Sequence, residues 1–492
     1  MPIHFSPMKI FDFSLVFVAL AACAEVNVGD PGDTDTGGDA DSDSDTDVDT
    51  DTDSDTDTDS DTDTDTDTDT DTDADSDADT DTDTDSDTDT DTDTDSDTDT
   101  DTDIDLVIES IAAGGYHTCV VFSSGAVRCW GKGEYGKLGY DSTNDIGDDS
   151  GEMPPADVNI GGTASQLDLG TNHSCARLDS GSVRCWGLGG NGQLGYGTNE
   201  NYGDGLNPMP PPDVAITGDA SSVWAGGGHT CAVLNTDAMQ CWGWGANGQL
   251  GYENVASIYI PGAEVAVGGT VIQMDMGWGH TCTLFSTEVV RCFGWNMDGQ
   301  LGVSNTFNVG DDIGEMPPDD VDIGGNVIQV ATGYTHSCAL LDTGAVRCWG
   351  SGGSGGLGYG NTDNVGDGVG EMPPEDVNVG GTVIQIGAGV AFTCALLETN
   401  DVRCWGDNAY GQLGIGITEN IGDEPTEMPP SDVNVGGDVF QIAVGNGHVC
   451  VLLDTNAVRC WGLGGNGRLG YENTDNIGDD EQPFTAGDVV LW

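Results

Sequence analysis

Seven pairs of cysteines recur along the chain, and the two members of every pair are ten residues apart. The pairs are Cys119 and Cys129, Cys175 and Cys185, Cys231 and Cys241, Cys282 and Cys292, Cys338 and Cys348, Cys394 and Cys404, and Cys450 and Cys460. Successive first cysteines are 56 residues apart, except for one interval of 51. A repeat of this length over residues 106–492 restricts the fold to units that each pack mainly on their neighbours.

Each cysteine pair brackets a predicted β-hairpin. An alternating apolar run leads into a three-residue turn such as Asp342-Thr343-Gly344, whose third residue is Gly, Asn or Asp in six of the seven repeats. These residues tolerate the positive φ of a three-residue hairpin loop. Because such a hairpin sets the two cysteines opposite each other, we predict seven disulfides. The pattern lacks the close Cys-x-x-Cys spacing of zinc sites, so we predict no metal centre.

The rest of each repeat also predicts short strands. A strand such as Val383-Ile384-Gln385-Ile386 precedes each first cysteine, a Pro-Pro-x-Asp-Val-x-Val-Gly-Gly segment comes later, and helical periodicity is absent. Three or four strands per unit predict an all-β, seven-bladed β-propeller. The chain ends with an Asp-Val strand and the repeat begins at Leu106, so we expect the N- and C-terminal strands to close the ring by completing one blade between them.

The repeat resembles the regulator of chromosome condensation repeat. The resemblance is carried by Gly-x-x-His-x-Cys-Ala-Leu, a turn, and Val-x-x-Trp-Gly-x-Gly-x-x-Gly-Gln-Leu-Gly, and it covers residues 106–492. It implies a seven-bladed propeller. That family includes a nuclear guanine-nucleotide exchange factor, a plant ultraviolet photoreceptor, ubiquitin-ligase subunits and a secreted β-lactamase inhibitor, so the resemblance also implies protein binding on a propeller face. Function does not follow from the fold alone.

The sequence of residues 1–22 is typical of a lipoprotein signal peptide, and the true start of the chain is Met1 or Met8. The apolar run is too short to span a bilayer. Leu-Ala-Ala-Cys, ending at Cys23, resembles the bacterial lipobox, which implies cleavage before Cys23 and its lipidation. Cys23 is also the one cysteine that the seven pairs leave over. Ala24 follows instead of Asp, which by resemblance favours the outer membrane and display at the cell surface. A secreted or periplasmic protein is the alternative.

Residues 23–105 predict a disordered stalk rich in Asp, Thr and Ser. Between Asp33 and Asp105 the chain has 36 aspartates and no Lys or Arg, and these dominate the formal charge of −76. Such a segment repels itself and has almost nothing apolar to bury. It lacks the turn glycine and bidentate glutamate of calcium-binding loops, so we expect an extended spacer without specific calcium sites.

The remaining 387 residues are acidic as well, with 48 Asp and Glu against 10 Lys and Arg. Because phosphate backbones are bound through Lys and Arg, this balance excludes nucleic acid as an expected partner. We expect membrane contact only through the lipid on Cys23. We expect a monomer and no cofactor.

Two polar residues recur in the repeat. A histidine stands two residues before the first cysteine in every repeat except the sixth, which has Phe392, and an arginine precedes the second cysteine in every repeat except the third, which has Gln240. Sixfold recurrence predicts structural roles. Four loops combine Gly-Asp with Glu-Met-Pro-Pro, at Glu152, Glu315, Glu371 and Glu427. We interpret them as polar turns, with weak calcium binding as the alternative.

The third repeat breaks the pattern. It lacks the acidic loop, and five of the eleven tryptophans lie between residues 224 and 295. Because exposed aromatic residues are frequent anchors at interfaces, we predict that a ligand contacts this sector. The candidate residues are Trp244, Tyr259, Trp278 and Trp295, and local core packing is the alternative.

No motif pairs a nucleophile with a base, and no phosphate-binding loop is present. The sequence therefore predicts a protein that is not an enzyme. We expect a lipid-anchored, surface-displayed binding scaffold for a protein or glycan. A secreted propeller that inhibits or regulates a partner protein is the alternative.

Overall fold

The computed structural model describes residues 106–492. The predicted signal peptide, Cys23 and the acidic stalk lie outside the described residues. Within 106–492, no helical segment has the length and apolar character needed to cross a bilayer.

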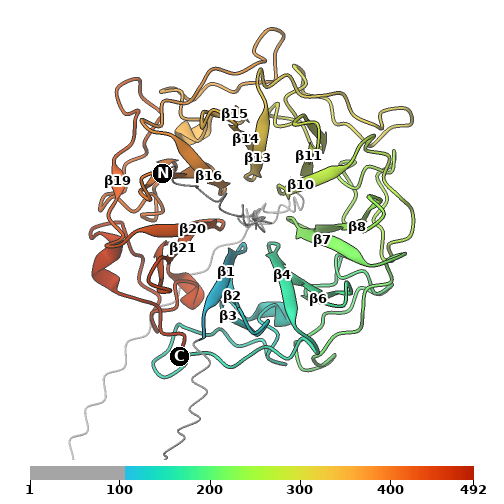
Figure 1. Cartoon of the computed structure of the whole chain (residues 1–492), viewed down its shortest axis with the longest axis vertical. Helices are drawn as coiled ribbons and strands as arrows, with labels where there is room; N and C mark the ends of the chain where they lie inside the picture. Colours follow the sequence, from blue (N-terminus) through green and yellow to red (C-terminus); the bar gives the residue numbers. More distant parts are fainter. Residues whose placement is uncertain (1–105) are drawn as a thin grey trace, which may run out of the picture. The chain divides into compact units, whose positions relative to one another are not determined.

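The described chain forms seven antiparallel sheets arranged around a common centre (Figure 1). The inner strands are β1 (Ile108–Ala113), β4 (Ala164–Leu169), β7 (Ala220–Ala225), β10 (Val271–Met276), β13 (Val327–Thr332), β16 (Val383–Ala388) and β20 (Val439–Val444). The middle strands are β2 (His117–Phe122), β5 (His173–Leu178), β8 (His229–Leu234), β11 (His280–Phe285), β14 (His336–Leu341), β17 (Phe392–Leu397) and β21 (His448–Leu453). We call each sheet a blade and number the blades in chain order.

The third strand of each blade carries the second cysteine. These strands are β3 (Val127–Gly131), β6 (Val183–Gly187), β9 (Met239–Gly243), β12 (Val290–Gly294), β15 (Val346–Gly350), β18 (Val402–Gly406) and β22 (Val458–Gly462), and blade 6 adds β19 (Asp432–Val433). Four short 3₁₀ segments complete the described elements: η1 (Glu134–Gly136), η2 (Gly353–Gly355), η3 (Gly465–Gly467) and η4 (Pro483–Ala486). The all-β propeller expected from the repeat is thus what the described residues form.

The hairpin between the middle and third strands follows the predicted turn. Gly125 N donates to the Phe122 carbonyl, and Gly125 has φ = 76°. Even Glu288, the exception in sequence, adopts φ = 65° at this position. Cys119 therefore stands opposite Cys129 in the β2–β3 register, and all seven cysteine pairs form disulfides with Cα atoms 4.0–4.1 Å apart.

The two termini do not share a blade, which corrects the expectation that they complete one between them. Val489 N donates to the Val458 carbonyl, so the C-terminal Asp-Val segment lies along β22 in blade 7. Val158 N donates in the same way to Val127 in blade 1. Each Asp-Val segment pairs with the strand that precedes it, because the intervening loop returns to its own blade. Every blade is therefore built from one continuous stretch of chain.

Neighbouring blades meet at seams, which we define as the contacts between consecutive sheets. At six seams a histidine ring meets a hydroxyl of the next blade: His117 and Ser174, His173 and Thr230, His229 and Thr281, His280 and Ser337, His336 and Thr393, and His448 and Thr118. At the remaining seam, Phe392 replaces the histidine and Val449 replaces the hydroxyl, and both are fully buried. At every seam, the two side chains that face each other at these positions are therefore either both polar or both apolar.

The recurring arginine joins the same blades nearer the rim. Arg347 Nε donates to Asp376 of its own blade at 2.7 Å, and Nη1 donates to the Ile323 carbonyl of the preceding blade. The other five arginines pair likewise with aspartates: Arg128 with Asp157, Arg184 with Asp213, Arg291 with Asp320, Arg403 with Asp432, and Arg459 with Asp488. In blade 3, Gln240 instead bonds Thr217 through both its amide oxygen and its amide nitrogen. The structural role predicted for this position is confirmed.

Blade 7 contacts blade 1 with the same types of bond. Thr118 Oγ1 lies 2.9 Å from His448 Nε2, and Arg128 donates to the Leu491 carbonyl. The Asn456 side chain accepts from Ile108 N at 2.7 Å, a bond that other seams make with a main-chain carbonyl. The first and last blades are thereby joined without a shared sheet.

Candidate ligand-binding site

Two turns of each blade lie side by side at one end of the sheet. One joins the inner and middle strands, and the other follows the third strand. Trp244 N donates to the Gly228 carbonyl, and Trp295 N donates to the Gly279 carbonyl, both across these two turns. The main chain of the first turn bonds the next blade, as Tyr334 N does with the Gly389 carbonyl. The side chains at these positions differ from repeat to repeat, so they can carry chemistry.

Four aromatic side chains from blades 3 to 5 meet at this end, and we call them the aromatic cluster: Trp244, Trp278, Trp295 and Tyr334. The Trp278 ring stacks on Tyr334, with centroids 5.1 Å apart and planes 10° apart. Its centroid also lies 4.8 Å from that of Trp244 and 5.3 Å from that of Trp295. Such tilted and offset pairs add to the stability gained by burying the rings. Trp278 is the hub of the cluster.

Glycines beneath the rings make this packing possible. A Cβ on Gly227 would lie 2.5 Å from the Trp278 carbonyl oxygen and 2.9 Å from its ring. A Cβ on Gly279 would lie 3.4 Å from Trp295 Cβ. Most other repeats carry a larger residue at one or both positions. The irregular third repeat therefore contributes space as well as a tryptophan.

The cluster rings are partly exposed, whereas the repeated tryptophan Trp242 is fully buried. Three of the four predicted ligand-contacting residues thus come together at a surface. Tyr259 does not join them among the described ring contacts: it packs over Gly192 of the preceding repeat and is 38% exposed. The sequence prediction also missed Tyr334. Alignment of the repeats would have found it, because Tyr334 in Gly333-Tyr334 occupies the position of Trp278 in Gly277-Trp278.

The seam histidines are unsuited to acid–base chemistry. Thr393 Oγ1 gives its proton to the Gly356 carbonyl at 3.0 Å, so His336 must donate through Nε2. Burial lowers the pKa of His336 to about 4. It lowers the pKa of His173, His229 and His280 to about 3. These rings are neutral near pH 7, in keeping with a structural role.

The acidic loops use their glutamates to hold the turn. Glu152 Oε2 accepts from Gly147 N at 2.8 Å, and Glu315, Glu371 and Glu427 accept from the corresponding glycines. This supports the interpretation as polar turns, while weak calcium binding stays an untested expectation. Among the described residues, Asp479, Asp480 and Glu481 form one acidic group within 4.8 Å, and no second feature points to a cation there.

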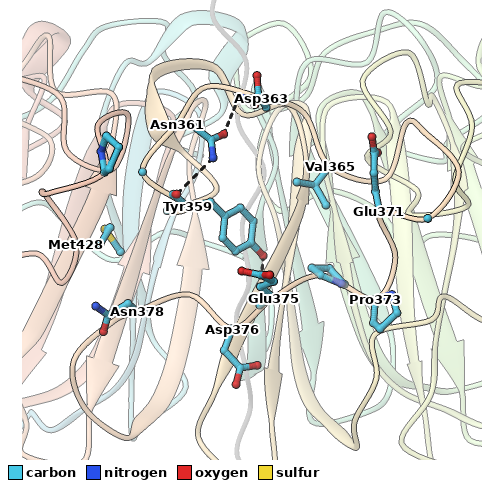
Figure 2. A pocket seen from close by; sticks show the side chains of 15 residues that line it. Tyr359, Asn361, Asp363, Val365, Glu371, Pro373, Glu375, Asp376, Asn378 and Met428 are labelled. Carbon is cyan, nitrogen blue, oxygen red and sulfur yellow. Dashed lines mark hydrogen bonds between the residues drawn. The ribbon is translucent and has the colours of Figure 1, made fainter.

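A cavity of about 580 Å³ lies between the loops of blades 5 and 6 (Figure 2). Asn361 Nδ2 donates to the Tyr359 carbonyl on its wall, and the Tyr359 hydroxyl donates to the Glu375 carbonyl. Two of its carboxylates are also engaged, because Glu371 accepts from main-chain amides and Asp376 pairs with Arg347. The cavity therefore belongs to the structural loops, and we assign it no ligand.

Comparison with known proteins identifies the repeat. Two family models of the regulator of chromosome condensation (RCC1) repeat match, one at residues 108–137, 164–193, 327–355, 383–412 and 441–468, the other at 180–233, 290–340 and 401–452. The ultraviolet-B receptor UVR8 of Arabidopsis thaliana is 32% identical over 316 residues, covering 63% of this chain and 67% of UVR8. The mouse E3 ubiquitin-protein ligase HERC2 is 31% identical over 336 residues, which are 67% of this chain and 6% of HERC2.

A solved structure supports the fold. Yeast RCC1 (Prp20), in its crystal structure bound to Kap60, superimposes with a TM-score of 0.60 at 17% identity, covering 77% of this chain and 85% of that one. With the matching repeat models, the similar UVR8 sequence and the seven sheets, the assignment is complete. The chain belongs to the regulator of chromosome condensation (RCC1) repeat family.

Proposed function

We propose that the protein is a non-catalytic binding scaffold that captures a protein or glycan through the aromatic cluster. The observation that carries this proposal is the meeting of Trp244, Trp278, Trp295 and Tyr334 on partly exposed end turns. Large, rigid aromatic rings supply contact area at a small cost in side-chain entropy and dominate many binding interfaces. Yeast RCC1 (Prp20), whose fold is similar, has been crystallised bound to a protein, Kap60.

The surroundings of the cluster favour this role over a packing role. The rings lie outside the histidine and arginine bonds that join the blades. Residues that fill an interior are usually enclosed, whereas these four keep part of their surface in solvent. They form a hydrophobic surface on an otherwise acidic molecule.

The same proposal includes how the scaffold is displayed. Lipidation at Cys23 anchors the protein in the outer membrane, and the stalk of residues 23–105 holds the propeller away from the cell surface. At about 3.5 Å per residue, the 73 residues from Asp33 to Asp105 reach at most roughly 250 Å. Support comes from the lipobox-like Leu-Ala-Ala-Cys and from the charge repulsion along the stalk.

The test uses residues that sister repeats carry at the same positions, so that the fold is preserved. Trp278→Gly copies Gly115 and Gly227, and Trp295→Leu copies Leu188. The wild-type protein, this double variant and the control Trp492→Ala, which removes a separate tryptophan that is 58% exposed, are compared on a glycan array and in pull-downs with envelope proteins. A true ligand loses affinity by at least about 30-fold in the double variant only. Equal capture by all three proteins would rule the cluster out as the binding site.

A further inference from the structure

Apart from the recurring seam arginines, three cations of the propeller gather at one place. Six of its ten Lys and Arg residues are the seam arginines, and Arg177 bonds the Ala220 carbonyl and Ser165. The remaining three, Lys132, Lys137 and Arg468, surround the ring of Tyr116. Their charged groups lie 5.0, 5.3 and 5.1 Å from its centroid. We call these four residues the basic cluster.

Two of these cations replace a neutral residue of the repeat. Lys137 and Arg468 occupy the position of Gln in Gly-Gln-Leu-Gly, which four repeats keep as Gln193, Gln249, Gln300 and Gln412. The replacements fall in blades 1 and 7, which are neighbours in the ring (Figure 1). Arg468 reaches toward the Gly115 carbonyl of blade 1. The two substitutions thus place both charges beside the ring of Tyr116 in blade 1.

Both buried cations lack a carboxylate partner. Lys137 is fully buried and Arg468 is 3% exposed. Lys137 donates to Asn172 Oδ1, and Arg468 donates to the Gly465 carbonyl at 2.8 Å. Neither takes part in any salt bridge among the described residues, where Lys132 pairs with Glu134 at 2.6 Å. A buried charge that contacts no carboxylate is unfavourable, and a bound anion in contact with it relieves this cost.

The titration of Lys137 agrees with this. Burial, and then the neighbouring charge of Lys132, lower its pKa to about 7. Burial also lowers the pKa of Arg468 to about 10. An anion that stabilises the charged forms would raise both values.

The charge count selects the class of anion. When Lys137 is protonated, Lys132, Lys137 and Arg468 supply three positive charges, while Glu134 and Asp145 supply two negative charges beside them. The excess of one suits a single carboxylate and disfavours a phosphate dianion. The carboxylates of Glu134 and Asp145 and the amide oxygens of Asn172 and Asn466 already accept bonds within the protein. Each of these oxygens has a second lone pair that can accept from a ligand hydroxyl. That mixture fits a ligand with one negative charge and several hydroxyl donors, which is the chemistry of an acidic sugar rather than of an acidic peptide.

We propose that the basic cluster binds an acidic saccharide, with the ligand carboxylate held by the field of Lys132, Lys137 and Arg468 and its hydroxyls bonded to the surrounding acceptors. Lys132 contacts the ligand at the surface, and the two buried cations act from beneath the Tyr116 ring. The site lies in blades 7 and 1, across the ring from the inner strands β10 and β13 of the blades that carry the aromatic cluster (Figure 1). The proposal does not depend on what the aromatic cluster binds.

The first experiment needs no variant. Binding of galacturonate, which carries one carboxylate, to the whole protein is measured by calorimetric titration and compared with its methyl ester, which keeps the hydroxyls and lacks the charge. The acid is expected to bind at least about 30-fold more tightly than the ester. Equal binding of acid and ester, no binding of the acid, or tighter binding of a polyglutamate peptide or inorganic phosphate would overturn the proposal.

The second experiment locates the site. Lys137→Gln with Arg468→Gln restores the residue of four sister repeats, and Arg459→Gln, which copies Gln240 at a seam, removes a cation elsewhere. The double variant is expected to lose the preference for the acid while Arg459→Gln keeps it. The reverse result, or unchanged binding in the double variant with an unchanged melting temperature, would assign the saccharide to another place.

Discussion

The seams between blades and the turns at the ends of the blades differ in how strictly they follow the repeat. At the seams, the side chains recur and their partners recur with them, so that His336 meets Thr393 as His280 meets Ser337. At the end turns, equivalent positions carry Trp295 in blade 4, Lys132 in blade 1 and Ser351 in blade 5. This difference indicates that packing of the blades into a ring restricts the residue types at the seams, whereas the residue types of the end turns are not restricted in this way. Substitutions should therefore affect stability at the seams and binding at the turns.

The largest loss of stability is expected within a blade. Replacing Cys338 and Cys348 with alanine removes the cross-link of the β14–β15 hairpin and should lower the free energy of unfolding by about 2–4 kcal/mol. Urea denaturation of the variant measures this change. Ligand binding at the end turns should survive in the folded fraction. A variant as stable as the wild type would show that the hairpin does not need its disulfide.

The seam pairs provide the next test, because blade 6 supplies a natural replacement. His336→Phe alone places a larger apolar ring against the Thr393 hydroxyl and should cost about 1–3 kcal/mol. Adding Thr393→Val reproduces the Phe392–Val449 seam and should recover part of that cost. A double-mutant cycle in urea measures the coupling. Additive effects would mean that the polarity match across the seam is incidental.

The His336 variants also test a prediction about how the free energy of unfolding depends on pH. The pKa of His336 is about 4 in the folded protein, below about 6.5 in the unfolded chain. Between these values the unfolded chain binds more protons, so stability is lost as pH falls from 6.5 toward 4. Asp275, whose pKa burial raises to about 8, acts in the opposite direction, as does Asp168. Six buried histidines against two buried aspartates predict a net loss of stability in acid.

The measurement is the unfolding free energy at pH 7 and at pH 4.5. The double variant His336→Phe with Thr393→Val should lose less stability in acid, because one proton fewer is taken up on unfolding. An identical pH dependence in wild type and variant would contradict the burial-lowered pKa of His336.

The smallest effect on stability is expected at an end turn. Where Gln is present, as in Gln193, its Oε1 accepts from the amide two residues earlier. Where it is absent, the turn instead forms a 3₁₀ segment with a positive φ, as at Tyr135 with φ = 66°. Lys137→Gln should switch this turn to the form of blade 2 and raise the free energy of unfolding by at most about 1 kcal/mol, because it removes a buried charge. A crystal structure of the variant that keeps a positive φ at Tyr135 would contradict this.

Local features of the fold were predictable from the sequence because they depend on neighbouring residues. The third turn residue fixed the hairpin, and the hairpin fixed which cysteines pair. The prediction that the two termini share a blade was wrong. Which blade an Asp-Val segment joins depends on tertiary contacts, such as the bond from Val489 N to the Val458 carbonyl. The candidate site was predictable in part: the excess of tryptophan indicated the sector, but Tyr334 and the exclusion of Tyr259 depended on which turns become neighbours.

The sequence by itself determined the number of blades, the seven disulfides and the identity of the recurring residues as structural. Only the tertiary structure decided that Lys137 and Arg468, at opposite ends of the repeat array, converge on Tyr116, and that the three tryptophans and Tyr334 share one surface. The physical reason is that a hairpin is specified by residues ten positions apart, whereas a contact between blades requires the ring to bring its two ends together. The periodicity of the sequence determines the structure of a single blade. The closed ring determines which of the residues that depart from the repeat lie next to each other.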